Sequence, residues 1–323
     1  MINVFAAYNE WLGRRMFFVV STALLVGFLL SKYIAPSLSN VAVVLFGYMT
    51  FITALDTSYR NFFNVLKKPG IILWMLLLIH IIMPVISWVI GMIFYPADSY
   101  VRLGLIIGAL IPIAVTSIIW TSVLKGDIAL TLVAVTIDTL VSPFLLPLFI
   151  FIIVGETVQI DYMDMFFGLL WMVTVPSMLG MALNDLTKGG LKKFGHSIGG
   201  LTSKIALFFV VVINAGLVAP EVDWDISLAK MLLVLLLIAV CGFGLGYLGS
   251  YVLKHRSWDS TVSMIYIVGM RNISFGSVLA VTYFPPAVAV PVTLAMLFQQ
   301  PLAGIVAYLL NRSLHSRLVR KHY

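Results

Sequence analysis

Two side chains carry opposite charges within stretches of the sequence that are otherwise apolar. Asp138 lies ten residues into an apolar run, whereas the other twelve of the thirteen acidic residues fall in expected loops or at the ends of such runs. Arg271 lies in IYIVGMRNISFG, residues 265–276, and is the one Lys or Arg at a comparable depth. A charge at the centre of a bilayer costs roughly 3 kcal/mol on insertion scales. We therefore expect Asp138 to be the counter-ion of Arg271.

A buried pair of this kind could act in two ways. In the first, Asp138 couples transport to protons: it is ionised while Arg271 is close and takes up a proton when Arg271 is drawn away. In the second, transport is uncoupled and Arg271 attracts the carboxylate of a substrate, aided by nearby helix N-termini. A fixed ion pair that only holds two helices in register is a third interpretation. The residues leave all three open.

The composition excludes a soluble fold. The chain has 323 residues, of which 61% are hydrophobic and 10% charged, and its mean hydropathy is +1.08. Recurrent apolar runs of about 18 residues or more indicate membrane-spanning helices. We expect an all-α polytopic membrane protein with about ten spans, near 16–35, 39–55, 70–94, 101–124, 128–154, 163–183, 203–219, 226–253, 258–283 and 287–311.

The distribution of charge predicts the orientation of these spans. Sixteen of the twenty Lys and Arg residues fall in the N-terminal segment, the C-terminal tail and alternate connections, and the opposite connections carry acids. Since basic residues favour the inner side, both termini are expected in the cytoplasm and the protein in the cell (inner) membrane. The basic residues that give the chain its net charge of +7 flank apolar runs and form no basic stripe. No nucleic-acid partner is therefore expected.

Ten spans divide into two sets of five. Because five is an odd number, the second set starts on the opposite side of the membrane, and the two repeats are inverted relative to each other. The expected repeats cover about 16–154 and 163–311, within a single domain of residues 1–323 that ends in a basic tail at 312–323. Pro143 and Pro301 lie at comparable depths in the fifth and tenth spans. The fourth span is interrupted at Pro112 and the ninth at Gly269–Asn272. Paired interrupted helices indicate the midplane site of a secondary transporter.

Three segments resemble the bile acid:sodium symporter family. They are GLIIGALIPIAVTSIIWTSVLKGDIALTLVAVTIDTLVSPFLLP (104–147), VGMRNISFGSVLA (268–280) and FNVLKKP followed by IIMP (63–69 and 81–84). The resemblance extends from about 41 to 310. It implies a panel domain and a core domain, with the broken fourth and ninth helices crossing in the core. It also implies transport of organic anions, such as bile acids or small keto and hydroxy acids, usually with sodium.

The same resemblance shows where the chain departs from the family. The positions that it assigns to sodium ligands hold Ile79, Ser117, Ile118, Thr131, Val135, Ile267 and Arg271. Only Ser117 and Thr131 keep an oxygen, and a hard cation needs several oxygen ligands. We expect no intact sodium site, no other metal and no cofactor. The guanidinium of Arg271 is expected to occupy the region where relatives hold sodium.

Candidate residues for substrate binding or coupling cluster around the two interruptions. A histidine could titrate near neutral pH, although a lone one on an apolar helix is more often a packed residue. Asn272 and Ser117 flank the breaks, where backbone groups released from the helices need partners. The candidates are Asp138, Arg271, Asn272, Ser117, Thr131, His80, Thr116, Gly269, Met270, Pro112 and Gln300.

The expected function is secondary transport of a small organic anion by alternating access, independent of sodium and either proton-coupled or uncoupled. The expected partners are that anion, the lipid bilayer and, in the coupled mechanism, protons. The alternatives are a sodium-coupled symporter that uses a residual site and an arsenite-type exporter of the same fold. An enzyme is not expected, because the sequence lacks HExxH, GxSxG, Cys/His metal spacing and a nucleotide-binding loop. The sequence carries no signal for an oligomeric state.

Overall fold

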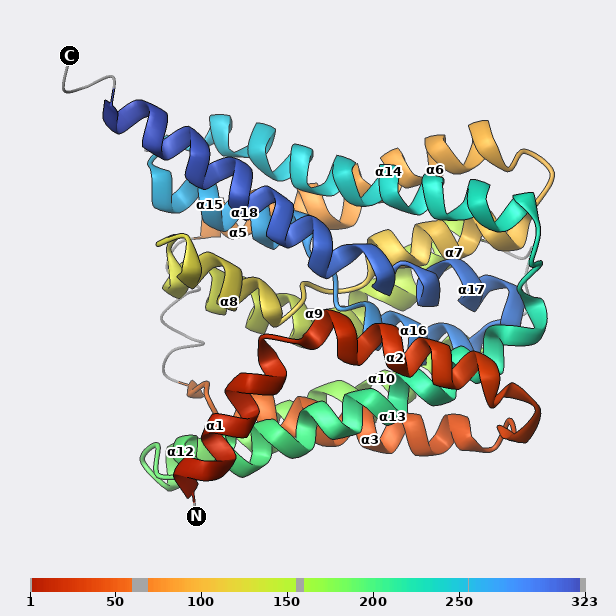
Figure 1. Ribbon diagram of the computed structural model, residues 1–323, viewed down its shortest axis with the longest axis horizontal. Coiled ribbons are helices and arrows are strands. Elements are labelled where there is room, and N and C mark those ends of the chain that lie inside the picture. The colour runs from red at the N-terminus through yellow and green to blue at the C-terminus, as the bar shows by residue number, and fades with distance from the viewer. Residues whose placement is uncertain (1, 60–68, 155–159, 255, 320–323) are drawn as a thin grey trace.

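Helices make up the described part of the protein. The computed structural model describes residues 2–59, 69–154, 160–254 and 256–319, and within these it contains helices, turns and one isolated β-bridge but no strand (Figure 1). Several basic and acidic residues used to orient the spans lie outside this part, namely Arg60, Lys67, Lys68, Glu156, Arg320 and Lys321. The FNVLKK stretch of the expected second-to-third helix region lies outside it too.

The α-helices follow one another with short connections. In chain order they are α1 (Ile2–Gly13), α2 (Met16–Leu29), α3 (Leu38–Ala54), α5 (Pro69–Leu77), α6 (Met83–Phe94), α7 (Ser99–Leu110), α8 (Thr116–Val123), α9 (Ile128–Val154), α10 (Tyr162–Leu169), α11 (Val175–Leu186), α12 (Lys192–Phe194), α13 (Gly200–Val218), α14 (Ile226–Gly249), α15 (Trp258–Gly269), α16 (Ile273–Tyr283), α17 (Pro286–Leu294) and α18 (Met296–Val319).

Shorter helical turns join some of these helices into longer rods. The π-helical turns η2 (Leu78–Ile82), η3 (Leu170–Thr174) and η4 (Gly195–Gly199) link α5 to α6, α10 to α11 and α12 to α13. The 3₁₀ turns are η1 (Ser31–Tyr33), η5 (Ala219–Glu221) and η6 (Ser250–Val252). Isolated π turns inside α-helices occur often at functional sites, and η2 contains His80.

Six helical rods in the described residues are long and apolar enough to cross a membrane, and a seventh forms if α1 and α2, bent by 74° at their junction, are taken as one. The expectation of a multi-pass all-α protein is confirmed, but α1 was not among the expected elements. The number of ten spans stays a prediction. The fourth and ninth expected spans are each split into two halves, of which α7 and α15, at 12 residues, are the longer. Such a half reaches only about 18 Å along its axis.

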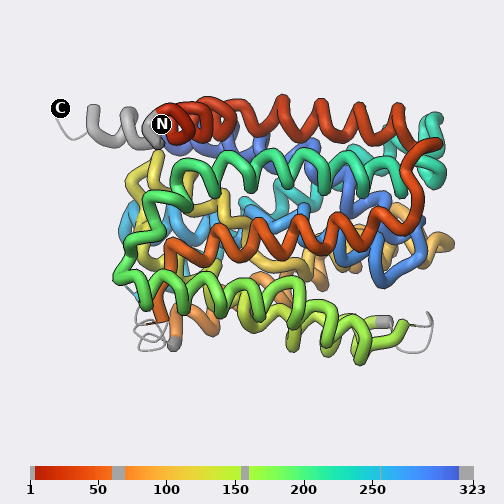
Figure 2. The backbone as a smooth tube through the Cα atoms, turned by 90° about the horizontal axis from the view of Figure 1, so that it is seen from below, coloured from red at the N-terminus to blue at the C-terminus, as the bar shows by residue number. Residues whose placement is uncertain are grey.

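The rods pack into two groups. In one group α13 packs on α2 and α3, and α3 packs on α11. In the other, α7 packs on α6 and α17, α14 on α15, and α16 on α17. Figure 2 shows the rods side by side along the long dimension, and in both views α1 begins and α18 ends at the same end of the molecule. Termini at one end fit an even number of spans.

The two broken helices meet at their breaks. Between α7 and α8, and between α15 and α16, the chain is extended, and Ile113 and Arg271 form an antiparallel bridge. The amide of Ala114 donates to the carbonyl of Met270 at 3.1 Å, and the amide of Asn272 donates to the carbonyl of Pro112 at 2.7 Å. The crossing of the two interruptions, expected from the resemblance, is therefore seen in the backbone itself.

Candidate transport site

The carboxylate of Asp138 is fully buried, and both its oxygens have partners. Its Oδ1 lies 2.5 Å from Nε2 of His80, and its Oδ2 accepts a hydrogen bond of 2.7 Å from the amide of Ile113. Asp138 lies on α9 and His80 on the π turn η2, so one carboxylate links three segments of the chain. No ion pair joins Asp138 to Arg271 among the described residues. The carboxylate of Asp138 acts on Arg271 only at longer range, and its role as the counter-ion of Arg271 stays a prediction.

The geometry of the crossing explains this outcome. The two hydrogen bonds of the crossing lie on either side of Ile113 and Arg271, which makes these residues a non-hydrogen-bonded antiparallel pair. In such a pair each amide points away from the opposite strand. The amide of Ile113 thus points away from Arg271, and Asp138 lies on that outer flank. The two charges act on each other at longer range.

His80 is held in place by its other neighbours. It is 3% exposed, and its ring stacks on Phe149 with 6.1 Å between the ring centres and an interplanar angle of 4°. Its Nδ1 has no hydrogen-bond partner among the described residues. From the sequence, His80 was a weaker candidate than Asp138 and Arg271. In the structure it directly contacts Asp138, the one carboxylate expected at membrane depth.

Arg271 lies on the other side of the crossing, against a cavity. It is 7% exposed, and neither of its terminal nitrogens, Nη1 and Nη2, has a hydrogen-bond partner in the described part of the chain. The cavity has a volume of about 60 Å³, and the side chain of Gln299, whose Oε1 is also unpartnered among the described residues, lines it too. A buried guanidinium normally finds acceptors for its five N–H groups. The site is thus chemically suited to an anion.

The two hydroxyls at the residual sodium-site positions have different surroundings. The hydroxyl of Thr131 donates to the carbonyl of Asp127 at 3.0 Å and to the hydroxyl of Thr121 at 3.3 Å. The hydroxyl of Ser117 is buried without a partner among the described residues. Within those residues no group of three or more His, Cys, Asp or Glu side chains could hold a metal ion. The absence of a sodium site stays a prediction.

Two further candidates join helices. The side-chain amide of Gln300 donates to the hydroxyl of Thr116 at 3.4 Å, and its Oε1 accepts from the indole N–H of Trp120 at 3.2 Å. These contacts connect α18 to α8, directly after the first break. Thr116 and Gln300 therefore fix the half-helix that begins at the crossing, and the contacts given for them do not reach Arg271.

The remaining candidates shape the crossing. The side chain of Asn272 caps α16 by accepting from the amide of Phe275 at 3.3 Å. Met270 and Pro112 contribute the two carbonyls of the crossing. A Cβ at Gly269 would lie 2.4 Å from the ring of Phe243, so only glycine allows α15 and α14 to pack this closely. Met270, Pro112 and Gly269 thus act through the backbone, and Asn272 acts through its side chain as well.

Comparison with known proteins agrees with this crossing of broken helices in an apolar, all-helical chain. Residues 42–223, more than half of the chain, match the Sodium Bile acid symporter family. The protein belongs to this family. It is therefore a multi-pass membrane transporter and not an enzyme.

Several relatives of this symporter-family protein are known by name. It is 36% identical over 292 residues, or 90% of this chain and 95% of the relative, to the "Uncharacterized protein YbaS" of Bacillus subtilis (strain 168). It is 24% identical over 260 residues to the "Uncharacterized sodium-dependent transporter YocS" of the same organism, covering 79% of this chain and 78% of the relative. It is 29% identical over 222 residues to the "Probable sodium/metabolite cotransporter BASS1, chloroplastic" of Oryza sativa subsp. japonica, covering 67% and 52%.

Two groups near the crossing of this symporter-family protein could not be predicted from the sequence, namely the side chain of Gln299 and the backbone amide of Ile113. Gln299 is not among the candidate residues expected from the sequence, although it lines the cavity at Arg271. Its neighbour Gln300 turns toward α8, and because adjacent helical residues point about 100° apart, Gln299 faces elsewhere and lines the cavity. The amide of Ile113 carries no signal in the sequence, since every residue except proline has one.

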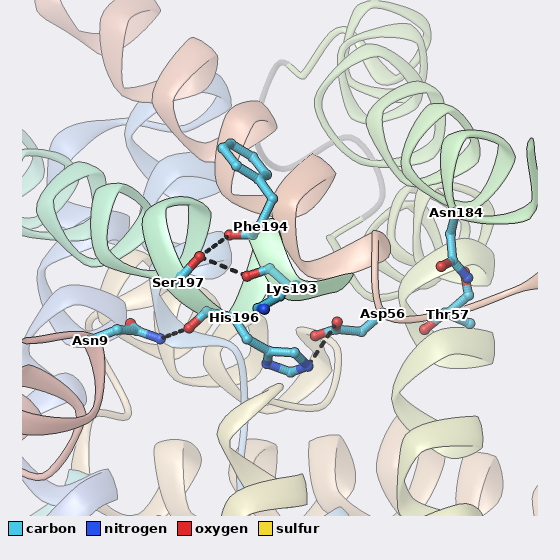
Figure 3. A network of polar contacts seen from close by, with 8 residues as sticks. All are labelled: Asn9, Asp56, Thr57, Asn184, Lys193, Phe194, His196 and Ser197. Carbon is cyan, nitrogen blue, oxygen red and sulfur yellow. Dashed lines mark hydrogen bonds and ion pairs between the residues drawn. The ribbon is translucent and has the colours of Figure 1, made fainter. Parts of the chain in front are cut away.

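A second polar cluster of this symporter-family protein lies where α3 ends and α13 begins (Figure 3). Nε2 of His196 lies 3.2 Å from Oδ1 of Asp56, and the carbonyl of His196 accepts from the side chain of Asn9 at 2.8 Å. The side chain of Asn184 donates to the carbonyl of Thr57 at 3.0 Å. Burial raises the pKa of Asp56, although His196 and Lys192 act in the opposite direction. The cluster ties α1, α3, α11 and η4 together.

Proposed function

We propose that this member of the sodium bile acid symporter family carries a small organic anion by alternating access, independently of sodium, and binds the anion at Arg271. The observation that carries the proposal is the guanidinium of Arg271, buried at the crossing with both Nη atoms unpartnered among the described residues. An uncompensated cation at this depth favours a negatively charged ligand.

The backbone near Arg271 supports the same proposal. The helices α8 and α16 begin directly after the two breaks. A helix N-terminus carries a partial positive charge and amides without intrahelical acceptors, and both favour an anion. Discontinuous helices of transporters use their half-helix N-termini for anionic substrates in this way. Ile273, the first residue of α16, lines the cavity together with Arg271, so the N-terminus of this helix lies close to the guanidinium.

We further propose that His80 and Asp138 couple transport to protons. Nε2 of His80 and Oδ1 of Asp138 lie within hydrogen-bond distance, at 2.5 Å, so a proton can pass directly between them. The ionisable group that faces this pair from outside it is Arg271, which interacts with Asp138 at longer range. Because Oδ2 of Asp138 is bonded to the amide of Ile113, movement of the crossing changes the surroundings of the carboxylate. An anion that neutralises Arg271 changes them as well.

For the transport cycle we propose the architecture that the sequence predicts. It has ten spans in two inverted five-helix repeats, with α7 and α8 as the fourth span and α15 and α16 as the ninth. The group around α13 is the panel and the group around α14 and α17 is the core. Both termini are cytoplasmic and the protein lies in the cell membrane. Rocking of one group against the other would then open the crossing alternately to each side.

A sodium-coupled symporter is the competing function, because relatives are named as sodium-dependent or sodium/metabolite transporters. Uptake into proteoliposomes separates the two. The probes are radiolabelled lactate, a small hydroxy acid, and radiolabelled taurocholate, a bile acid. Each is measured with sodium or choline outside, and with or without an inward proton gradient.

We expect uptake of one probe to persist in choline, to rise with the proton gradient and to be lost in Arg271→Gln. Lys230→Gln is the matched control, because it removes a cation that lies over the ring of Tyr95, outside the cavity. Uptake that requires sodium, or that survives Arg271→Gln at the wild-type rate, would overturn the proposal.

A further inference from the structure

The cavity at Arg271 is lined mainly by the group of helices around α14 and α17. The helices α7, α14, α15, α17 and α18 contribute its walls, together with Met83 of α6 and Ile273 of α16. Apart from Arg271 and Gln299, the described residues that line it are glycine, proline and apolar side chains. The cavity therefore offers one positive charge, one amide and an apolar surface.

This chemistry limits the charge of the ligand. A guanidinium binds a carboxylate through two parallel hydrogen bonds, and both Nη atoms of Arg271 are unpartnered among the described residues. A second carboxylate would meet no second cation among the residues that line the cavity. Burying an unpaired charge is strongly unfavourable. The cavity therefore favours a monoanion over a dianion.

The volume limits the size of the ligand. A cavity of about 60 Å³ holds roughly four water molecules, since each needs about 15 Å³ of such space. This corresponds to a carboxylate with a body of a few carbon atoms.

The glycines of the cavity indicate which residue sets this limit. A Cβ at Gly104 would lie 2.2 Å from the carbonyl oxygen of Val288, and one at Gly269 would clash with Phe243, so close helix packing explains both glycines. A Cβ at Gly242 would make ordinary contacts from 3.5 Å. At Gly108 a Cβ would meet nothing within 4 Å.

Packing therefore gives no reason for glycine at position 108. Gly108 lies inside α7, where glycine is one of the least favourable residues for a helix. A side chain there would extend into the open space of the cavity that Gly108 lines. The lack of a side chain keeps this space open.

We infer that the Arg271–Gln299 cavity binds a short-chain monocarboxylate with an apolar body, and that Gly108 is the residue that limits its length. The inference rests on the proposed role of Arg271 in anion binding and adds the substrate class. The carboxylate pairs with the guanidinium, Gln299 lies beside it, and the apolar chain packs toward α7 and α14.

Equilibrium binding to the purified protein tests this, with radiolabelled acetate, butyrate and succinate as probes. We expect the wild-type protein to bind butyrate at least tenfold more tightly than succinate, and Arg271→Gln to bind neither monocarboxylate. In Gly108→Ala the affinity for butyrate should fall at least tenfold, the effect of about one methyl group in a filled pocket, while the affinity for acetate changes less than twofold. Gly108→Leu should bind neither acetate nor butyrate.

Gly244→Leu is the matched control, because a Cβ at Gly244 also meets nothing within 4 Å but this residue lies on the exposed surface of α14, outside the cavity. It should bind all probes as the wild type does. Equal binding of succinate and butyrate, no binding of butyrate by the wild type, or an unchanged acetate-to-butyrate ratio in Gly108→Ala would overturn the inference. Sodium-independent lactate or taurocholate uptake that depends on Arg271 would still support the proposed function in each of these cases.

Discussion

The imidazole of His80 and the carboxylate of Asp138 lie 2.5 Å apart in the interior of the helix bundle, although 58 residues separate them in the sequence. The same carboxylate accepts the amide of Ile113, whose opposite residue in the crossing is Arg271. The His80–Asp138 pair and the buried cation thus lie on the two flanks of one short antiparallel bridge.

Replacing the carboxylate tests the coupling role of the pair. Asp138→Asn keeps an acceptor for the amide of Ile113 and removes the charge, and His80→Gln keeps a donor toward Asp138 and removes the ionisable ring. We expect each variant to lose most of the pH dependence of uptake, and Asp138→Asn to slow uptake at least tenfold, because each change removes one of the two groups that the proposal assigns to proton transfer. The measurement is the initial uptake rate in proteoliposomes across a pH series. An unchanged pH profile in both variants would exclude a proton role for the pair.

Removing the buried cation should stabilise the protein while it abolishes transport. Arg271→Met replaces an unpartnered guanidinium with an apolar side chain of similar length, and we expect the unfolding free energy to rise by about 1–3 kcal/mol. Anion uptake should be lost, because the residue proposed to bind the anion is gone. Functional residues often lower the stability of the protein in this way. Thermal unfolding in detergent measures the first effect. A lower Tm in Arg271→Met than in the wild type would mean that the guanidinium has a structural partner.

Close packing at the second break makes a steric prediction. In Gly269→Ala the new Cβ would lie 2.4 Å from the ring of Phe243, and we expect a loss of about 1–3 kcal/mol in stability. Gly242→Ala is the control on the facing helix, because its nearest contacts begin at 3.5 Å. The double variant Gly269→Ala with Phe243→Leu should recover part of the loss. Equal melting of both single variants would contradict the close contact between α14 and α15.

The cluster around Asp56 predicts a pH-dependent contribution to stability. Since the pKa of Asp56 is raised above its ordinary value of 3.8 in the folded protein, the folded state holds this proton more tightly than the unfolded state does. The contribution therefore favours folding at low pH and is lost as the pH rises through the raised pKa. Asp56→Asn should melt slightly above the wild type at about pH 7 and at the same temperature near pH 4. The effect is small, because 36% of the Asp56 side chain is exposed.

The opposite result at Asp56 has a clear meaning. If Asp56→Asn melts below the wild type near neutral pH, the attraction of His196 and Lys192 outweighs the burial of the carboxylate. Thr187→Val is a suitable control at the same end of the molecule, because its hydroxyl bonds only to carbonyls of its own helix among the described residues and does not titrate.

The sequence alone located the parts of the site but not their partners. The depth of Asp138 and Arg271 followed from counting along apolar runs, and the breaks followed from Pro112 and the Gly269–Asn272 stretch, since these signals are local. Charge balance, the only criterion that the sequence offered, indicated Arg271 as the partner of Asp138, but the two form no direct ion pair among the described residues. His80 could supply a hydrogen bond as well, and the sequence does not say which helix faces which.

What the sequence determined by itself is the membrane-spanning, all-helical character of the protein, the two interruptions and the charged residues within apolar runs. Composition and local backbone chemistry decide these without reference to other segments. The tertiary structure decided which groups meet. The crossing turns the amide of Ile113 toward Asp138, the π turn brings His80 to the same carboxylate, and Arg271 is left facing a cavity with Gln299. Contacts between segments far apart depend on how the helices pack, and only the folded chain fixes that.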